Sequence, residues 1–151
     1  MATEIDRIVR MLEKTFDAYP WYGNSIQDIL SEVDSEIVNK KHGPTHNIIE
    51  LVLHMVSWRV YVMKRLQGED SYKVTDEANF PKPGTWKAAI ELLESSQKDL
   101  VKEIKKFPEA KLNELVPEGV HKYTFYTLIH GIIQHDIYHL GQIAYIRKSF
   151  S

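Results

Sequence analysis

Residues 85–107 read TWKAAIELLESSQKDLVKEIKKF, the clearest helical pattern in the chain. Apolar residues and one glutamine recur along it in alternating steps of four and three: Trp86, Ile90, Leu93, Gln97, Leu100, Ile104 and Phe107. This spacing places them along one side of a helix, the pattern of a seam between packed helices. Thr85 is the predicted N-cap of this helix, and Pro108 is its predicted stop.

Three further long helices are predicted on either side of this one, because glycine and proline interrupt the chain only at wide intervals. They span residues 3–18, 45–67 and 125–148, and a short amphipathic piece covers residues 26–33. Thr45 is the predicted N-cap of the helix over residues 45–67, and Gly68 ends it. Patterns typical of strands are absent. We therefore expect an all-α fold, a four-helix up-down bundle that forms a single domain over residues 1–151, with the crossing order left open.

Composition narrows the classes of function. The chain has 151 residues, of which 43% are hydrophobic and 26% charged, as is typical of a soluble globular domain. A net charge of −2 and a pI of about 6.4 favour neither nucleic acid nor a membrane as a partner. The first residues carry charges where a signal peptide would be apolar, so we expect a cytoplasmic protein. Since cysteine is absent, imidazole and carboxylate groups must hold any transition metal.

The seven histidines include two pairs at i,i+4 spacing, His42/His46 and His135/His139. The first pair straddles a Gly-Pro sequence at a helix start, where ordinary polar loop residues are the better interpretation. The second pair lies one turn apart on the inner edge of the predicted last helix, so both imidazoles can reach one ion. The alternative is two unrelated core histidines, and burying two imidazoles without partners is costly.

The predicted helix over residues 45–67 contributes two residues of interest. His54 falls on its polar side and, taken alone, looks like a surface histidine. Arg59 falls inside its apolar arc, as Asp136 does in the last helix. An unpaired buried charge costs several kcal/mol. We therefore expect Arg59 and Asp136 each to have an oppositely charged or imidazole partner, and each other is one such pairing.

The segment HGIIQHDIYHLGQI, residues 130–143, resembles the C-terminal signature of the DinB-like superfamily. The segment FDAYPWYGNS, residues 16–25, is similar to that family's exit from the first helix. Further matching positions are Leu53-His54, Trp58-Arg59 and Trp86. The similarity extends over nearly the whole chain, and it implies a four-helix bundle that is frequently dimeric.

The resemblance also implies a metal site. The family binds a metal through one histidine of the second helix and the HxxxH pair of the fourth, and the matching residues here are His54, His135 and His139. The expected cofactor is one divalent ion, Zn, Ni, Co or Fe, because imidazole suits them all. Three protein ligands leave a position open for water or substrate, which favours a working site over a structural one.

Some members of that family are transferases or isomerases that use bacillithiol or mycothiol, and others are called metal-dependent hydrolases. The resemblance thus implies a metal-dependent enzyme, a thiol-dependent transferase or a hydrolase, acting on a small-molecule substrate, with a low-molecular-weight thiol in the first case. The alternative is a non-catalytic metal-binding or stress-response module. A homodimer is expected under both, because the helix over residues 45–67 is apolar over more of its circumference than one bundle face requires.

Spacing indicates which residues would support the three ligands. Gln142 lies three residues past His139 on the same edge and could bond a water or a substrate carbonyl. Glu50 lies one turn before His54 and could orient its ring or act as a base. Tyr61 is expected at the mouth of the site. Gly131, one turn before His135, leaves room for a ligand.

Two other metalloprotein motifs fit less well. His135-Asp136-x-x-His139 resembles the zincin motif, but its acid is one methylene shorter than glutamate and a helical bundle is the wrong context. A ferritin-like di-iron site needs paired Glu-x-x-His motifs on helices, and Glu118-Gly-Val-His121 is predicted to lie in a loop. Both interpretations are rejected.

Overall fold

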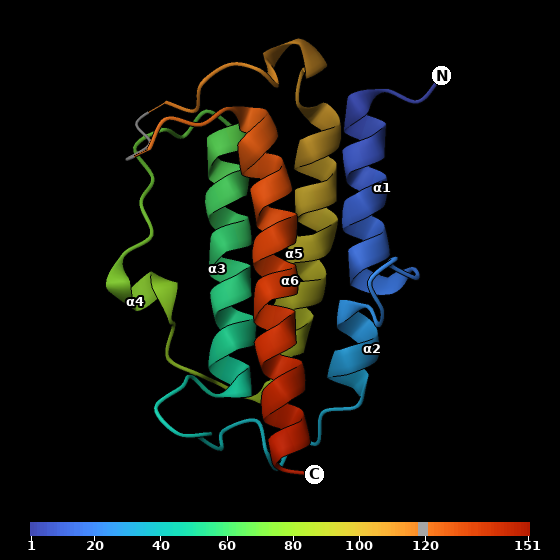
Figure 1. Ribbon diagram of the computed structural model, residues 1–151. Coiled ribbons are helices and arrows are strands. Elements are labelled where there is room, and N and C mark those ends of the chain that lie inside the picture. Colours follow the sequence, from blue (N-terminus) through green and yellow to red (C-terminus); the bar gives the residue numbers. More distant parts are fainter. Residues whose placement is uncertain (118–120) are drawn as a thin grey trace.

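The computed structural model describes residues 1–117 and 121–151, and in this part of the chain four long helices carry the fold (Figure 1). They are α1 (Glu4–Asp17), α3 (Ile48–Leu66), α5 (Trp86–Lys106) and α6 (Phe125–Ser149). The connections hold α2 (Ile26–Ser31), α4 (Asp76–Asn79) and the 3₁₀ turn η1 (Glu109–Lys111). The predicted all-α, single-domain fold is confirmed. The Glu118-Gly-Val-His121 sequence falls largely outside the described residues. Among the described helices, none is both long and apolar enough to cross a membrane.

Side-chain caps set where the helices begin. The Thr85 hydroxyl accepts a hydrogen bond from the Ala88 backbone N–H at 3.1 Å, which confirms the predicted start of α5. The predicted cap at Thr45 is wrong, because α3 begins after Asn47. Asn47 and Glu50 form a capping box there, with two side-chain to backbone hydrogen bonds of 3.0 Å. The backbone N–H groups at a helix start have no partner within the helix, and two reciprocal bonds satisfy more of them than a single threonine cap would.

The long helices alternate in direction at two connections but not at the third. Figure 1 shows α1 and α6 running one way, and α3 and α5 running the other. Since α1 and α3 both pack against α5 and α6, α1 and α3 lie at opposite corners of the bundle. Strict up-down alternation is therefore broken between α3 and α5. The connection over residues 67–85 is long enough to return along α3 before α5 begins.

Two apolar clusters stacked along the bundle form the core. One cluster joins the starts of α3 and α5 to the end of α6, and includes Met55, Leu93 and Ile143. The other joins the ends of α3 and α5 to the starts of α1 and α6, and includes Leu100 and Ile129. Leu93 and Leu100 belong to the predicted seam of α5, and both are buried. The clusters thus agree with the helix directions in Figure 1.

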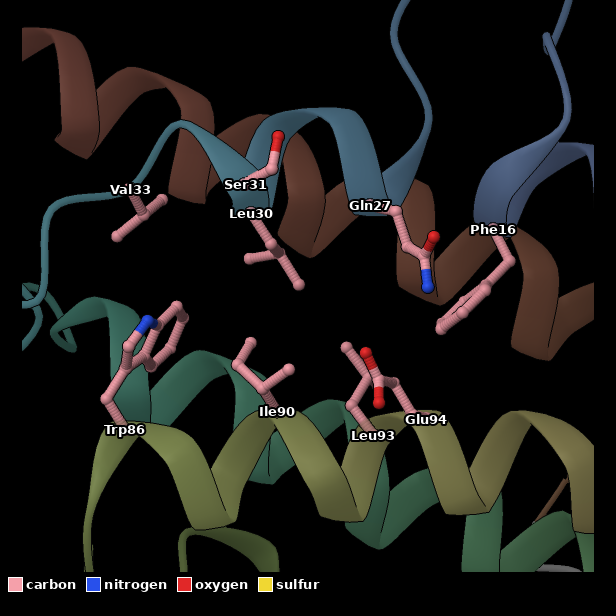
Figure 2. A pocket seen from close by; sticks show the side chains of 9 residues that line it. All are labelled: Phe16, Gln27, Leu30, Ser31, Val33, Trp86, Ile90, Leu93 and Glu94. Atoms are coloured by element: carbon pink, nitrogen blue, oxygen red, sulfur yellow. The ribbon is translucent and has the colours of Figure 1, made fainter.

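The short helix α2 leaves a hollow of about 440 Å³ against α5 (Figure 2). Figure 2 shows Leu30 of α2 and Ile90 of α5 pointing toward one another across it, with Gln27 and Glu94 facing each other at one end. The hollow lies beside α1, α2 and α5, whereas the histidines of interest belong to α3 and α6. It is therefore separate from the candidate metal centre.

Arg59 and Asp136 form a fully buried ion pair between α3 and α6, which confirms the prediction that each has a partner and selects the pairing with each other. The Arg59 Nε and Nη2 atoms lie 3.0 and 2.8 Å from Asp136 Oδ2. Arg59 Nη1 also donates to Gln97 Oε1 at 2.9 Å and to Ser96 Oγ at 3.3 Å, both on α5. Burial raises the pKa of the Asp136 carboxyl, and the charge and hydrogen bonds of Arg59 act against that rise. One side chain thus connects three of the four long helices.

Replacing Arg59 by methionine should lower the free energy of unfolding by about 3–5 kcal/mol, because Asp136 is left buried without its partner. Urea unfolding followed by circular dichroism measures this change. The double variant Arg59→Met/Asp136→Leu should recover most of the loss, because it leaves no buried charge. A single variant within about 1 kcal/mol of the parent would show that the pair does not hold the helices together.

Candidate metal centre

Three imidazoles from two helices converge in the groove between α3 and α6. His54 belongs to α3, and His135 and His139 lie one turn apart on α6. His135 Nε2 lies 3.1 Å from His54 Nε2 and 3.1 Å from His139 Nε2. One ligand atom from each residue falls within 4.8 Å of the other two. His54, whose polar helix side suggests a surface residue, is buried in this group.

Hydrogen bonds fix the proton position on two of the rings. His54 Nδ1 lies 2.9 Å from the Asn79 backbone carbonyl, which can only accept, so Nδ1 carries the proton. His139 Nδ1 lies 2.6 Å from Gln142 Oε1 and donates in the same way. In both residues Nε2 is left with a free lone pair that faces the third imidazole. This arrangement, with Nδ1 donating to an oxygen, is the one that orients metal-binding histidines.

The two nitrogen lone pairs that face His135 Nε2 suit a shared metal ion better than a single proton on that nitrogen. A proton on His135 Nε2 can satisfy only one of the two lone pairs that face it. Zinc–nitrogen bonds of about 2.0–2.1 Å place neighbouring ligand nitrogens roughly 2.9–3.4 Å apart, and the observed 3.1 Å lies in that range. His135 Nδ1 is buried and has no partner within the described residues. The three side chains therefore form a group that could hold a metal ion.

Burial keeps the three imidazoles in the neutral form that binds metals. It lowers the pKa of His54 and of His139. Burial, followed by the charges that His139 and His54 would carry, lowers the pKa of His135 to about 3. A metal therefore does not have to displace protons from these rings at neutral pH.

The connection over residues 67–85 supplies contacts that hold the group from outside the bundle. The Phe80 ring is stacked between the His46 and His54 rings, with centroid distances of 3.7 and 4.3 Å. Trp58 Nε1 donates to Asn79 Oδ1 at 2.9 Å, while the Asn79 carbonyl accepts from His54. Sequence reasoning missed Asn79, the last residue of α4, and Phe80, which follows it, because a single helical turn is too short to show a periodicity that would indicate its contacts.

Of the two residues predicted to support the histidine ligands, Gln142 reaches its histidine and Glu50 does not. Gln142 Oε1 accepts from His139 Nδ1 and orients that ring, while its predicted bond to a water or a substrate carbonyl stays a prediction. Glu50 is not brought to His54: its carboxylate accepts from Lys41 Nζ at 2.8 Å and lies 3.2 Å from His46 Nδ1. The Asn79 carbonyl takes the orienting role on His54 that Glu50 was predicted to have.

Two cavities flank the three-histidine group along the groove. The first, of about 240 Å³, is lined by His135 and by mainly apolar side chains, among them Trp58 and Tyr61. Gly131 also lines it, and a Cβ atom there would meet nothing within 4 Å. Tyr61 and Gly131 thus both line a cavity next to His135, and their predicted roles toward a ligand stay predictions. The second cavity, of about 490 Å³, lies on the side of His139 and Gln142 and is also lined by the predicted non-ligands His42 and His46.

Two tyrosines that line the first cavity pair through their hydroxyls. The Tyr61 and Tyr123 hydroxyls lie 3.1 Å apart, and Arg65 Nε donates to the Tyr61 oxygen at 3.3 Å. Burial, followed by the hydrogen bond with Tyr61, raises the pKa of Tyr123 to about 12. Tyr123 therefore keeps its proton at neutral pH and can donate a hydrogen bond.

The fold and the site together define a helical bundle with a three-histidine group that could hold a metal ion. A sequence model of the DinB superfamily matches residues 12–143, and the chain belongs to this superfamily. Among solved structures, it is similar to a DinB-like protein, YjoA, from Bacillus subtilis, with 15% sequence identity and a TM-score of 0.67. The match covers 96% of this chain and 92% of that chain, and it shows a shared fold. No curated protein matches the chain in a sequence search.

Acid should destabilise the metal-free protein through His135. Its unfolded imidazole takes up a proton below pH 6.5, whereas the folded one does so only near pH 3. Between these values the unfolded state binds more protons, so the free energy of unfolding falls as the pH falls. Urea unfolding with a chelator across this window, compared between the parent and His135→Gln, measures the effect. The parent should show the steeper fall, and equal slopes would contradict the burial of a neutral His135.

Proposed function

We propose that the protein binds one divalent metal ion through His54, His135 and His139 and is a metal-dependent enzyme acting on a small molecule. The observation that carries the proposal is the convergence of three ring nitrogens, two of which have their lone pairs oriented by Asn79 and Gln142. Open three-ligand sites serve catalysis more often than structure. Zn, Ni, Co and Fe all suit three imidazoles.

A bound divalent ion would act as a Lewis acid on a water, thiol or substrate oxygen beside it. The protein's own residues would orient and shield the reacting groups. Asn79 and Gln142 hold the ligand rings, while Phe80 and Trp58 cover the group and exclude water from one side. The Tyr123 hydroxyl, which is protonated at neutral pH, would donate a hydrogen bond to a molecule bound in the cavity that Tyr123 lines.

The size and lining of the cavity beside His135 support the proposal of a small substrate that carries an apolar group. Its volume of about 240 Å³ is below the usual range of about 300–1,000 Å³ for drug-sized ligands. The aromatic rings of Trp58 and Tyr61 line the cavity, and Gly131, which has no side chain, leaves free space in it. The larger cavity beside His139 offers room for a second reactant. A low-molecular-weight thiol there would make the enzyme a transferase, and water in its place would make it a hydrolase. We further propose that the enzyme is a cytoplasmic homodimer.

Metal content tests the centre first. Elemental mass spectrometry should find about one divalent ion per chain, because three neutral imidazoles converge on one point. Each of His54→Ala, His135→Ala and His139→Ala should lose the ion. His130→Ala is the matched control, because His130 lies on the same helix but bonds the Tyr126 carbonyl at 2.9 Å. Metal retained in all three ligand variants would refute the site.

Turnover tests the enzymatic part of the proposal. The metal-loaded protein should act on small apolar esters, or on small apolar electrophiles together with a low-molecular-weight thiol. Activity should disappear with a chelator and return with metal. Metal-loaded protein that is inactive throughout this screen would favour the non-catalytic metal-binding role.

Filling the cavity beside His135 should separate substrate binding from metal binding. Gly131→Leu should lower kcat/KM for the substrate found in the screen by at least about tenfold, or about 1.4 kcal/mol, because the new side chain occupies the open space. Metal content should stay at the parent level. Gly131→Ala, which adds one methyl group, should have the smaller effect. Unchanged kinetics in Gly131→Leu would place the substrate elsewhere.

A further inference from the structure

A second groove, on the α1–α6 edge of the bundle, is separate from the three-histidine group. It has a volume of about 430 Å³ and is lined by apolar residues of both helices, Met11 on α1 and Ile133 and Ile137 on α6. At 100° per residue, Ile133 and Ile137 lie on the opposite side of α6 from His135 and His139. The groove therefore serves neither the metal centre nor its two cavities.

Positive charge follows one wall of this groove. Arg7, Arg10 and Lys14 share one side of α1, and all three line the groove. Arg7 has a long ion pair of 3.7 Å with Glu4, which is partly buried. Within the described residues, no carboxylate oxygen lies within 4.0 Å of the charged groups of Arg10 or Lys14. These two charges can therefore pair with an anion in the groove.

The turn after α1 places aromatic rings over the groove. Tyr19 adopts a φ of 56°, a left-handed conformation that a bulky residue rarely takes. After it, the Gly23 N–H donates to the Pro20 carbonyl at 3.4 Å and closes a turn around Trp21 and Tyr22. Trp21 lines the groove although its side chain is fully exposed, and Tyr22, which is also exposed, lines it too. The strained residue Tyr19 thus precedes a turn that holds an exposed indole beside the cations of α1, and backbone strain of this kind is found at ligand-binding sites.

We propose that this groove binds a small amphiphilic anion, an aromatic or aliphatic carboxylate, sulfonate or phosphate. Its apolar part would lie between Trp21 and Ile137, and its charged group would meet Arg10 and Lys14. The volume lies within the usual range for small-molecule sites. The positive charge is confined to one ridge of α1 in a chain of net charge −2, which suits one small anion better than a polyanion or a lipid surface.

The three tryptophans provide a direct test, because each lines a different cavity. Trp21 lines the α1–α6 groove, Trp58 the cavity beside His135, and Trp86 the α2–α5 hollow. The probe is 2-naphthalenesulfonate, titrated into the metal-loaded full chain labelled with ¹⁵N, with the indole N–H signals followed by NMR. Trp21→Phe assigns the Trp21 signal. We expect a saturable shift of that signal and little change in the other two.

Charge variants test the recognition of the anion. Arg10→Gln/Lys14→Gln should weaken the affinity read from the Trp21 signal at least tenfold, and neutral 2-naphthylmethanol should bind correspondingly weakly. The matched control is Lys98→Gln/Lys102→Gln, which removes two exposed charges from α5 and should leave the affinity unchanged. Unchanged affinity in the α1 variant, or a saturable shift at Trp58 or Trp86 alone, would overturn the proposal. A change of oligomeric mass on Trp21→Ala in analytical ultracentrifugation would also overturn it, because a second copy of the chain would then cover the groove.

Discussion

The buried pair of Arg59 and Asp136 is the interaction on which the arrangement of the helices depends. Its hydrogen bonds connect α3, α5 and α6, and both side chains are withdrawn completely from solvent. A buried pair of this kind contributes little net stability compared with apolar residues, but a single unpaired member is costly. Rotations of α6 that separate the two charges are therefore disfavoured. Asp136 directly follows His135 in α6, so the rotation that pairs Asp136 with Arg59 also brings His135 and His139 to His54.

The parallel course of α3 and α5 has a consequence for the centre. A connection between the end of one helix and the distant start of the next must return along the bundle, and residues 67–85 do so beside α3. On the way, Asn79 bonds both His54 and Trp58, and Phe80 inserts between His46 and His54. The segment that makes the topology possible thus also orients one ligand and covers the group. An antiparallel hairpin with a short loop would have left His54 without these contacts.

Local features were predictable from the sequence, and contacts between distant segments were not. Helical periodicity, the Thr85 cap and the HxxxH spacing depend only on neighbours in the chain, and they located α5 and the His135/His139 pair. Its position in an apolar arc also predicted that Arg59 has a partner, because a buried charge requires one, and Asp136 was one of the partners considered. His54 could be assigned only through a family resemblance, since its own helix places it on a polar side. Glu50 was given the wrong partner, because its local capping box competes for the same carboxylate. Which residues of the connection reach the centre depends on tertiary packing alone.

The most direct test of the account is X-ray absorption spectroscopy of the metal-loaded protein at the edge of the bound metal. A centre built from His54, His135 and His139 should show three imidazole ligands, with nitrogens at about 2.0–2.1 Å if the ion is zinc, and at least one further light ligand. The same measurement on His54→Ala should show one imidazole fewer in whatever metal remains bound. A spectrum with two or fewer imidazoles in the parent protein, or one that His54→Ala leaves unchanged, would contradict a centre built from α3 and α6 together.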